Sequence, residues 1–484
     1  LLYLLSYLNY LIWVQKAHFP KNNTMSSLSF ALFFSLLSLL FPFISSSNST
    51  TTTIPLSLFN TKNPSQDFYE KLTHLASISL ARANYIKKSQ DSPVSTTPLY
   101  PQSYGGYSIT LSFGTPPQKI PFIMDTGSDF VWFPCTTRYL CTNCSVSSAT
   151  SQSIPTFIPK SSSSARVLGC LNPKCGWIHS NNPKSRCQDC ESPTNCKQVC
   201  PPYIILYGAG STGGLALVDT LDLSNKKVPN FLVGCSLFSS KQPAGIAGLG
   251  RGLASLPSQL DVKKFSYCLV SHKFDDTGKS SNLVLDFNAS GEKTSDLSYT
   301  PLQKNPVVSE KNALSVYYYV SLRKITVGGK KVMIPYKYLT PDSNGNGGSI
   351  VDSGTTFTFM NRGVFEPVLD AFVKQVKGIP RSESIEIITG LRPCFNISRQ
   401  ETVSLPELKF HYKGGAEMTL PIANYFSFAG ETDVICLTMV TDSAFGPELS
   451  TGPSIILGNF QMQNYLVEFD LKNEKFGFKQ QMCK

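Results

Sequence analysis

Charged residues and histidines are scarce in this chain, and each scarcity argues against a class of function. Asp, Glu, Lys and Arg make up 15% of the 484 residues, and the net charge of +11 is not gathered into clusters interleaved with aromatic residues. A nucleic-acid footprint needs clustered positive charge, so we expect no nucleic-acid partner. The diffuse positive field favours at most weak binding to acidic polymers. The five histidines form no His-x-x-x-His pair, which argues against a zinc protease.

Helical periodicity is scarce as well. Ser, Thr, Pro, Gly and Asn are plentiful, short alternating segments recur, and the length suffices for two lobes of ordinary domain size. We therefore predict a fold dominated by β-strands and turns. Helices are expected only at 67–88, at 364–377 and, as a short one, from residue 257.

Targeting and processing features dominate the N-terminal part. The apolar run at 28–44 predicts a signal peptide at 25–47, with a short membrane anchor as the alternative. Residues 1–24 precede the first methionine, and we interpret them as an upstream segment outside the protein. Residues 48–98 are predicted to be a propeptide, with a plain linker carrying a solvated helix as the alternative. The polar C-terminus has no GPI signal, and no stable membrane anchor is expected.

Cysteines are abundant, with nine of the fourteen between residues 135 and 200. Cys141-x-x-Cys144 and Cys187-x-x-Cys190 have the spacing of a zinc ribbon. In an oxidising compartment, however, disulfides are the default, so we expect no metal and no cofactor.

A secreted chain also exposes its sequons to glycosylation. Asn-x-Ser/Thr sequons occur at Asn48, Asn143, Asn288 and Asn396, and we predict glycosylation of the last three. The expected location is the extracellular space or cell wall, reached through the secretory pathway, with the vacuole as the alternative.

Two carboxylate turns of one form, apolar-apolar-Asp-(Thr/Ser)-Gly-(Ser/Thr), lie 227 residues apart, with their acids at Asp125 and Asp352. An alternating strand and a turn precede each copy, and an apolar-apolar-Gly segment follows each. This ordered repetition predicts two homologous β lobes, at 99–310 and 311–484, the first carrying the Cys-rich insertion 135–200.

The repeated turns suit acid–base chemistry if they face each other. Asp125 and Asp352 would then share one proton, because the first charge opposes the second ionisation. The ionised acid can take a proton from a trapped water while the protonated acid polarises a carbonyl. Gly127 and Gly354 would let the loops approach closely. Hydroxyls beside the acids would hold the carboxylates coplanar; they belong to Thr126, Ser128, Ser353 and Thr355.

A third element is the segment 203–214, an apolar strand followed by a glycine-rich tip. This pattern predicts a hairpin. Its Tyr207, Gly208 and Gly210 would form a mobile flap that closes over a cleft, and an ordinary surface hairpin is the alternative.

Together these three elements resemble the pepsin-like aspartic protease family, over residues 104–483. The resemblance implies a bilobal double β-barrel with an active-site cleft between two homologous lobes and a few short helices. It also implies a catalytic dyad of Asp125 and Asp352, and a flap tyrosine, Tyr207, that is hydrogen-bonded by Trp132. The resemblance further implies a cleft that is lined by Ile123 and prefers bulky apolar residues. It also implies protein or peptide substrates and a monomeric state.

The cysteine-dense stretch resembles the nepenthesin-type subgroup of plant members, and no saposin-like insert interrupts the second lobe. This resemblance implies bridges Cys268–Cys483 and Cys394–Cys436, and a link from the insertion to Cys235. The nine insertion cysteines, Cys144 among them, would close five bridges together with Cys235. That is more than the usual set of the subgroup, so the pairing inside the insertion stays open.

These features predict a secreted aspartic endopeptidase. One alternative is a catalytically silent protein of the same fold that inhibits or binds glycoside hydrolases, as some plant relatives do. The intact turns, hydroxyl partners and flap tyrosine argue against it. A second alternative is a carbohydrate hydrolase with a carboxylate pair, against which the Thr/Ser-Gly context argues.

Overall fold

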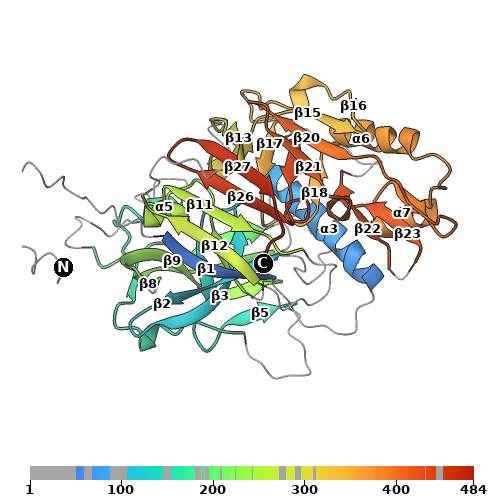
Figure 1. Cartoon of the computed structure of the whole chain (residues 1–484). Coiled ribbons are helices and arrows are strands. Elements are labelled where there is room, and N and C mark those ends of the chain that lie inside the picture. The colour runs from blue at the N-terminus through green and yellow to red at the C-terminus, as the bar shows by residue number, and fades with distance from the viewer. Residues whose placement is uncertain are drawn as a thin grey trace, which may run out of the picture. The chain divides into compact units, whose positions relative to one another are not determined.

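Strands dominate the computed structural model (Figure 1), which confirms the predicted all-β-dominated class. The structure describes residues 51–58, 68–87, 106–144, 154–179, 187, 190, 196–207, 210–223, 225–242, 244–271, 280–288, 296–308, 312–430, 432–442 and 451–484. The predicted signal peptide and the segment before it lie outside these residues. Within the described ranges, no helix has the length and hydrophobicity of a membrane span.

The largest sheet has 15 strands and includes segments from both ends of the described chain. The C-terminal strands β26 and β27 belong to it, next to strands that precede residue 302. In pairing order, the sheet comprises β13 (Ser298–Pro301), β27 (Lys475–Gln480), β26 (Tyr465–Asp470), β11 (Lys264–Cys268), β12 (Ser280–Asp286), β1 (Thr51–Leu58), β2 (Tyr107–Phe113), β3 (Gln118–Asp125), β10 (Gly245–Gly248), β4 (Trp132–Pro134), β9 (Lys227–Ser240), β8 (Gly210–Asp222) and β6 (Arg166–Val167), with β5 (Leu140–Thr142) on β9 and β7 (Tyr203–Tyr207) on β8.

Three smaller sheets are built from residues after 317. The five-stranded sheet comprises β14 (Tyr318–Val320), β17 (Ser349–Val351), β25 (Ile455–Leu457), β18 (Thr358–Met360) and β24 (Met439–Val440). The four-stranded sheet comprises β16 (Lys330–Lys331), β15 (Leu322–Val327), β20 (Leu408–Tyr412) and β21 (Glu417–Leu420). The three-stranded sheet comprises β19 (Cys394–Asn396), β23 (Val434–Leu437) and β22 (Phe426–Phe428).

The repetition seen in the sequence reappears as a repeated strand arrangement. β3, which enters the first Asp-x-Gly turn, pairs in parallel with β10, and β17, which enters the second, pairs in parallel with β25. Each of these partners then pairs in antiparallel fashion with the strand that follows its turn, β4 or β18. All residues of β10, β17 and β25 are buried, which suits their continuous apolar character.

Five α-helices occur in the described residues: α3 (Phe68–Lys87), α4 (Cys175–Ile178), α5 (Leu256–Leu260), α6 (Arg362–Gln375) and α7 (Glu383–Thr389). The predicted helices correspond to α3, α5 and α6. Helix α6 begins where the side chain of Asn361 accepts a hydrogen bond from the Gly363 amide, and it buries Val364, Val368 and Phe372. Helix α3 is coloured blue in Figure 1 and lies among orange and red strands from the second half of the chain.

All fourteen cysteines are paired. Cys268 bonds to Cys483 and Cys394 to Cys436, the two pairs that the family resemblance implies. Five further bridges close the insertion: Cys135–Cys235, Cys141–Cys144, Cys170–Cys187, Cys175–Cys200 and Cys190–Cys196. Both Cys-x-x-Cys segments therefore contribute to disulfides.

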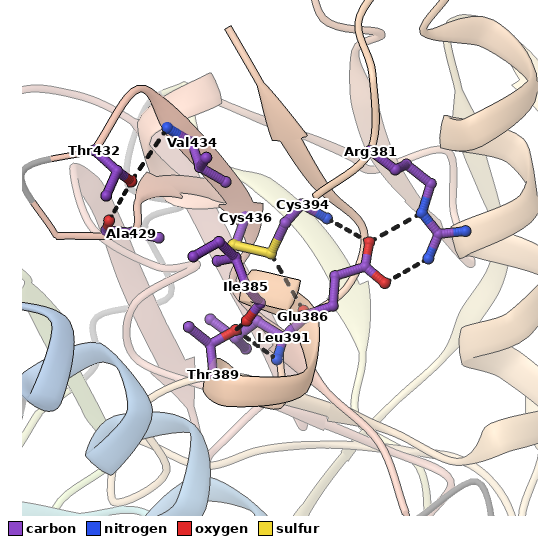
Figure 2. The surroundings of a disulfide bond; sticks show 10 residues. All are labelled: Arg381, Ile385, Glu386, Thr389, Leu391, Cys394, Ala429, Thr432, Val434 and Cys436. Atoms are coloured by element: carbon purple, nitrogen blue, oxygen red, sulfur yellow. Dashed lines mark hydrogen bonds and ion pairs between the residues drawn. A yellow bond between two sulfur atoms is a disulfide. The ribbon is translucent and has the colours of Figure 1, made fainter. Parts of the chain in front are cut away.

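The Cys394–Cys436 bridge joins β19 to β23 beside α7 (Figure 2). Glu386 of α7 accepts hydrogen bonds from the Cys394 amide and from the guanidinium of Arg381. The bridge and this carboxylate thus fix α7, the helix against which α3 packs.

Candidate active site

The ends of β3 and β17 bring Asp125 and Asp352 together. Both side chains are buried, with 1% and 0% of their surface exposed. A Cβ placed on Gly127 would collide with Asp352 Oδ1, and one on Gly354 would collide with Asp125 Oδ1. Each turn therefore packs its glycine against the opposite carboxylate, an approach that only the missing side chain permits.

The two turns are also joined by reciprocal hydrogen bonds. The Thr126 amide donates to Ser353 Oγ (3.0 Å), and the Ser353 amide donates to Thr126 Oγ1 (2.9 Å). Each hydroxyl also donates to a backbone carbonyl of the opposite strand: Thr126 Oγ1 donates to Val351, and Ser353 Oγ donates to Met124. Thr126 and Ser353 therefore hold the turns together, whereas the sequence suggested that all four hydroxyls bind the carboxylates.

The other two hydroxyls do bind the carboxylates. Ser128 Oγ donates to Asp125 Oδ2 and Thr355 Oγ1 donates to Asp352 Oδ2, both at 2.6 Å. The second oxygen of each carboxylate accepts from the backbone amide two residues later, at 2.9 Å in both turns. The two acids consequently have matching environments, as a symmetric pair requires.

Arg82 of α3 contacts both acids, and it was not among the predicted site residues. Its Nη2 donates to Asp125 Oδ1 (2.7 Å) and to Asp352 Oδ1 (3.2 Å), and its Nε donates to Asp352 Oδ2 (3.0 Å). Only 11% of the Arg82 side chain is exposed. One guanidinium thus spans both carboxylates.

The sequence pattern of α3 indicates that Arg82 lies on its apolar face. Leu75, Ser79, Arg82 and Ile86 follow a spacing of four, three and four residues, so they lie on one face of the helix. Leu75 and Ile86 are buried. A charged residue on the apolar face of a helix needs a buried partner, and two carboxylates provide one here.

Burial and charge act differently on the two acids. Burial disfavours ionisation of Asp125, but Arg82 and the Ser128 hydrogen bond outweigh it and hold the pKa of Asp125 below its usual range. Burial raises the pKa of Asp352, the charge of Asp125 adds to this rise, and Arg82 opposes it. Burial likewise disfavours the charge of Arg82, yet the two acids raise its pKa. With Arg82 bound, Asp125 therefore ionises more readily than Asp352.

Apolar and polar contacts hold α3 in this position. Leu72, Leu75 and Ile86 are buried in one cluster with residues of β14, β17, β18, β23 and β25. Ser79 Oγ accepts from the Phe357 amide (2.9 Å), close to the second turn. Lys87 Nζ donates to the Pro453 carbonyl (3.3 Å) and lies 5.0 Å from the Phe359 ring centre.

Residues 51–58 are also packed into the protein. β1 lies between β12 and β2, where Leu56 pairs with Ile109 and Ile54 pairs with Leu283. The side chains of Ile54 and Leu56 are buried in the main core. The segment predicted as a propeptide therefore contributes an internal strand and a helix at the acids, which differs from a solvated linker.

The hairpin of β7 and β8 approaches the first acid. Trp132 Nε1 donates to the Tyr207 hydroxyl at 2.7 Å. Burial and the charge of Asp125 raise the pKa of Tyr207. Ile123 is 7% exposed and belongs to the apolar cluster that contains Trp132 and Tyr207. Gly210 pairs with Tyr207, and Gly208 lies outside the described residues.

The remaining predicted sites lie away from the acids in sequence. Asn143 and Asn288 are exposed, and Asn396 is half-buried. Within the described part of the chain, Cys175, His179 and Cys200 cluster as metal ligands would. Their two sulfurs form a disulfide, so they offer no thiolates to a metal.

Comparison with known proteins identifies the class. A family profile described as "Xylanase inhibitor N-terminal" matches residues 107–285, and one described as "Xylanase inhibitor C-terminal" matches residues 317–480. The chain belongs to the plant pepsin-like aspartic protease family and is by class an aspartic endopeptidase.

Individual relatives support this membership. The chain is 33% identical to aspartic proteinase nepenthesin-1 of Nepenthes gracilis, over 78% of either protein. It is 34% identical to nepenthesin-2 of the same plant, over 80% of either protein.

Solved structures share the fold. The crystal structure titled "edgp" has a TM-score of 0.61 and 20% identity, covering 90% of this chain and 95% of that one. The crystal structure of soybean Basic 7S globulin has a TM-score of 0.57 and 17% identity. The match covers 89% of this chain and 96% of the globulin chain. Likeness at this level of identity extends to the fold alone.

Proposed function

We propose that this chain is the latent precursor of a secreted aspartic endopeptidase that cleaves protein or peptide substrates. The observation that carries the proposal is the pair of carboxylates with matching environments, held by reciprocal bonds between two turns. Such a pair suits general acid–base hydrolysis, because one acid can be ionised while the other keeps its proton.

In the proposed reaction, a water replaces the Arg82 guanidinium between Asp125 and Asp352. One acid of the pair is ionised and takes a proton from the water, while the other keeps its proton and donates it to the substrate carbonyl. The water oxygen bonds to the carbonyl carbon, and collapse of the tetrahedral intermediate breaks the C–N bond while the acid that took the proton of the water gives it to the leaving amine. Because water is the nucleophile, no covalent intermediate with the enzyme forms. Ser128 and Thr355 keep the carboxylates oriented. Closure of the hairpin that carries Tyr207 excludes bulk water.

The proposed latency comes from residues 48–98 acting as a propeptide, after a signal peptide at 25–47 and before lobes at 99–310 and 311–484. Arg82 lowers the pKa of both acids, so its binding is favoured where they are ionised. The contact between Arg82 and the acids is therefore stable at pH values above the pKa values that the two acids have without Arg82. It is lost as the pH falls through the lowered pKa of Asp125. Acidification therefore weakens the blockade.

Seven disulfides support the proposed secretion, because disulfides persist in oxidising compartments. The proposal includes the extracellular space or cell wall as location, with the vacuole as the alternative. It also includes a monomeric state and glycans at Asn143, Asn288 and Asn396.

The test is acid-pH cleavage of a quenched peptide by the processed enzyme and by an Asp352→Asn variant. Asp370→Asn serves as the matched control, because that carboxylate is 62% exposed on α6. We expect the Asp352 variant to fold and lose turnover, while the control retains the wild-type rate. Wild-type turnover by the Asp352 variant would disprove the assignment of the dyad.

A silent binding protein is the alternative function, favoured by the description of the matching profiles as xylanase inhibitor. The same preparation decides between the two. If the processed chain cleaves no peptide between pH 2 and 7 and instead inhibits a glycoside hydrolase, the alternative holds.

A further inference from the structure

The four-stranded sheet of β16, β15, β20 and β21 carries a concentration of positive charge. Segments 322–338 and 405–420, which build this sheet and its adjoining turns, contain seven Lys or Arg residues and two Glu residues, a net charge of +5. The whole chain has a net charge of +11. Almost half of the net positive charge of the chain thus comes from 33 residues that fold next to one another.

Strand register places these cations on one face. Ile325 is buried in the main core, so its neighbours Lys324 and Thr326 point to the opposite, outer face of β15. Thr326 pairs with Lys331 on one side and with Lys409 on the other. Neighbouring strands lie about 5 Å apart, so Lys331 and Lys409 lie on the outer face on either side of Thr326, about 10 Å apart.

A second cross-strand row on this face combines one lysine, one histidine and one glutamate. Lys324 pairs with His411, which pairs with Glu417 on β21. Lys413 follows at the end of β20 and is exposed. Figure 1 shows β15, β16 and β20 side by side, with α6 next to them. Helix α6 contacts β15. On the opposite face Thr326 is buried, whereas Lys324, Lys331 and Lys413 are exposed.

The acidic residues of this face are already neutralised. Lys409 Nζ lies 3.5 Å from a Glu407 oxygen and 3.4 Å from a Glu417 oxygen, and His411 Nδ1 lies 2.9 Å from Glu417. Within the described residues, Lys324, Lys331 and Lys413 form no ion pair, and all three are exposed. Their charges are therefore available to an external anion.

An exposed aromatic ring borders the cations. Tyr336 is 65% exposed, and hydrogen bonding by Thr340 and Arg323 lowers the pKa of its hydroxyl. A flat apolar ring face beside positive charges suits a polymer of acidic sugars, whose rings can stack while their carboxylates pair with lysines. The seven disulfides point to an oxidising compartment, which disfavours nucleic acid as the polymer that this face meets.

We propose that the outer face of this sheet binds an acidic polysaccharide of the polyuronate class. The site is independent of the catalytic acids. It would hold the protein on a charged matrix without contributing to peptide hydrolysis. Because exposed charges carry the attraction, the affinity should fall as salt rises.

The experiment measures binding of the full chain to polygalacturonate by affinity electrophoresis and by co-sedimentation. The triple variant Lys324→Glu, Lys331→Glu, Lys413→Glu removes the proposed site. The matched control Lys119→Glu, Lys160→Glu, Lys197→Glu makes the same change of charge at three exposed lysines of the first half. Neutral dextran and single-stranded DNA are the comparison polymers. Thermal melting checks the fold, and Lys→Gln versions replace any variant that fails to fold.

We expect the sheet variant to lose at least tenfold in affinity for polygalacturonate and the control to lose less than threefold. Wild-type protein should not bind dextran, and raising the salt should release it from polygalacturonate. Equal losses in both variants would show that only the overall charge attracts the polymer. Tighter binding to DNA than to polygalacturonate would overturn the assigned class of partner.

Discussion

Replacing Arg82 with Met should convert the latent precursor into a partly active enzyme. The substitution keeps an apolar stem on α3 but removes three hydrogen bonds to Asp125 and Asp352. Breaking a buried ion pair on one side costs about 3–5 kcal/mol, and the 11% exposure of Arg82 argues for the lower end. Because 1.4 kcal/mol is a factor of ten, α3 should open about a hundredfold more often at neutral pH.

The assay follows cleavage of a quenched peptide by the intact precursor at pH 4 to 7, in the first minutes after mixing. Mass spectrometry of the same samples confirms that the chain is uncut. Lys87→Met is the matched control, because Lys87 anchors the same helix at Pro453 and Phe359 without touching the acids. Both changes weaken α3, but only loss of Arg82 should flatten the increase in activity that acidification produces in the wild type.

Two results would refute this reasoning. An Arg82→Met precursor as inactive as the wild type would show that the apolar contacts of α3 block the cleft by themselves. Equal activity and equal pH dependence in the Arg82 and Lys87 variants would show that the guanidinium exerts no specific control over the acids.

Three further changes test the site. Gly127→Ala should reduce turnover at least a hundredfold in a folded protein, because the added methyl group collides with Asp352 Oδ1; near-normal turnover would contradict the close approach. Tyr207→Phe leaves the buried Trp132 N–H without its partner, so chemical denaturation should show a loss of about 1–3 kcal/mol in the free energy of unfolding, and an unchanged value would contradict the bond. Thr355→Val removes a hydrogen bond that lowers the pKa of Asp352, so the high-pH loss of kcat/KM should move to higher pH; a move to lower pH would contradict the reasoning.

The turns were predictable because each is a short contiguous motif. An apolar strand that ends in Asp-x-Gly specifies its own local geometry. The repeated apolar-Gly segments correspond to β10 and β25, whose pairing with the strands that enter the turns is seen only in the structure. The roles of the hydroxyls were not predictable from the motif. Thr126 and Ser353 bind across a separation of 227 residues, which only the assembled pair of turns creates.

The contributions of residues 51–87 show where sequence patterns fail. Pro55 lies inside β1, and a proline normally argues against an internal strand because it donates no hydrogen bond. The helix at 68–87 was predictable from its periodicity, but the contact between Arg82 and the acids depends on how α3 docks. Likewise, the positive charge of the four-stranded sheet was not predicted, because the charge is divided between two segments that are distant in sequence.

The two kinds of contact made by α3 respond differently to acid. Protonation of the acids removes the attraction for Arg82, whereas burial of Leu72, Leu75 and Ile86 is independent of pH. Each of these side chains contributes roughly 1.5–3 kcal/mol when fully buried, so together they outweigh the ionic contact. Acid alone should therefore loosen the helix at Arg82 without expelling it. Lasting activation then requires cleavage of the chain between α3 and β2, after which release of the helix is no longer opposed by its covalent attachment. A precursor whose segment 88–105 is made resistant to cleavage should show on acidification only the small activity that transient opening of α3 allows, and this activity should disappear when neutral pH is restored.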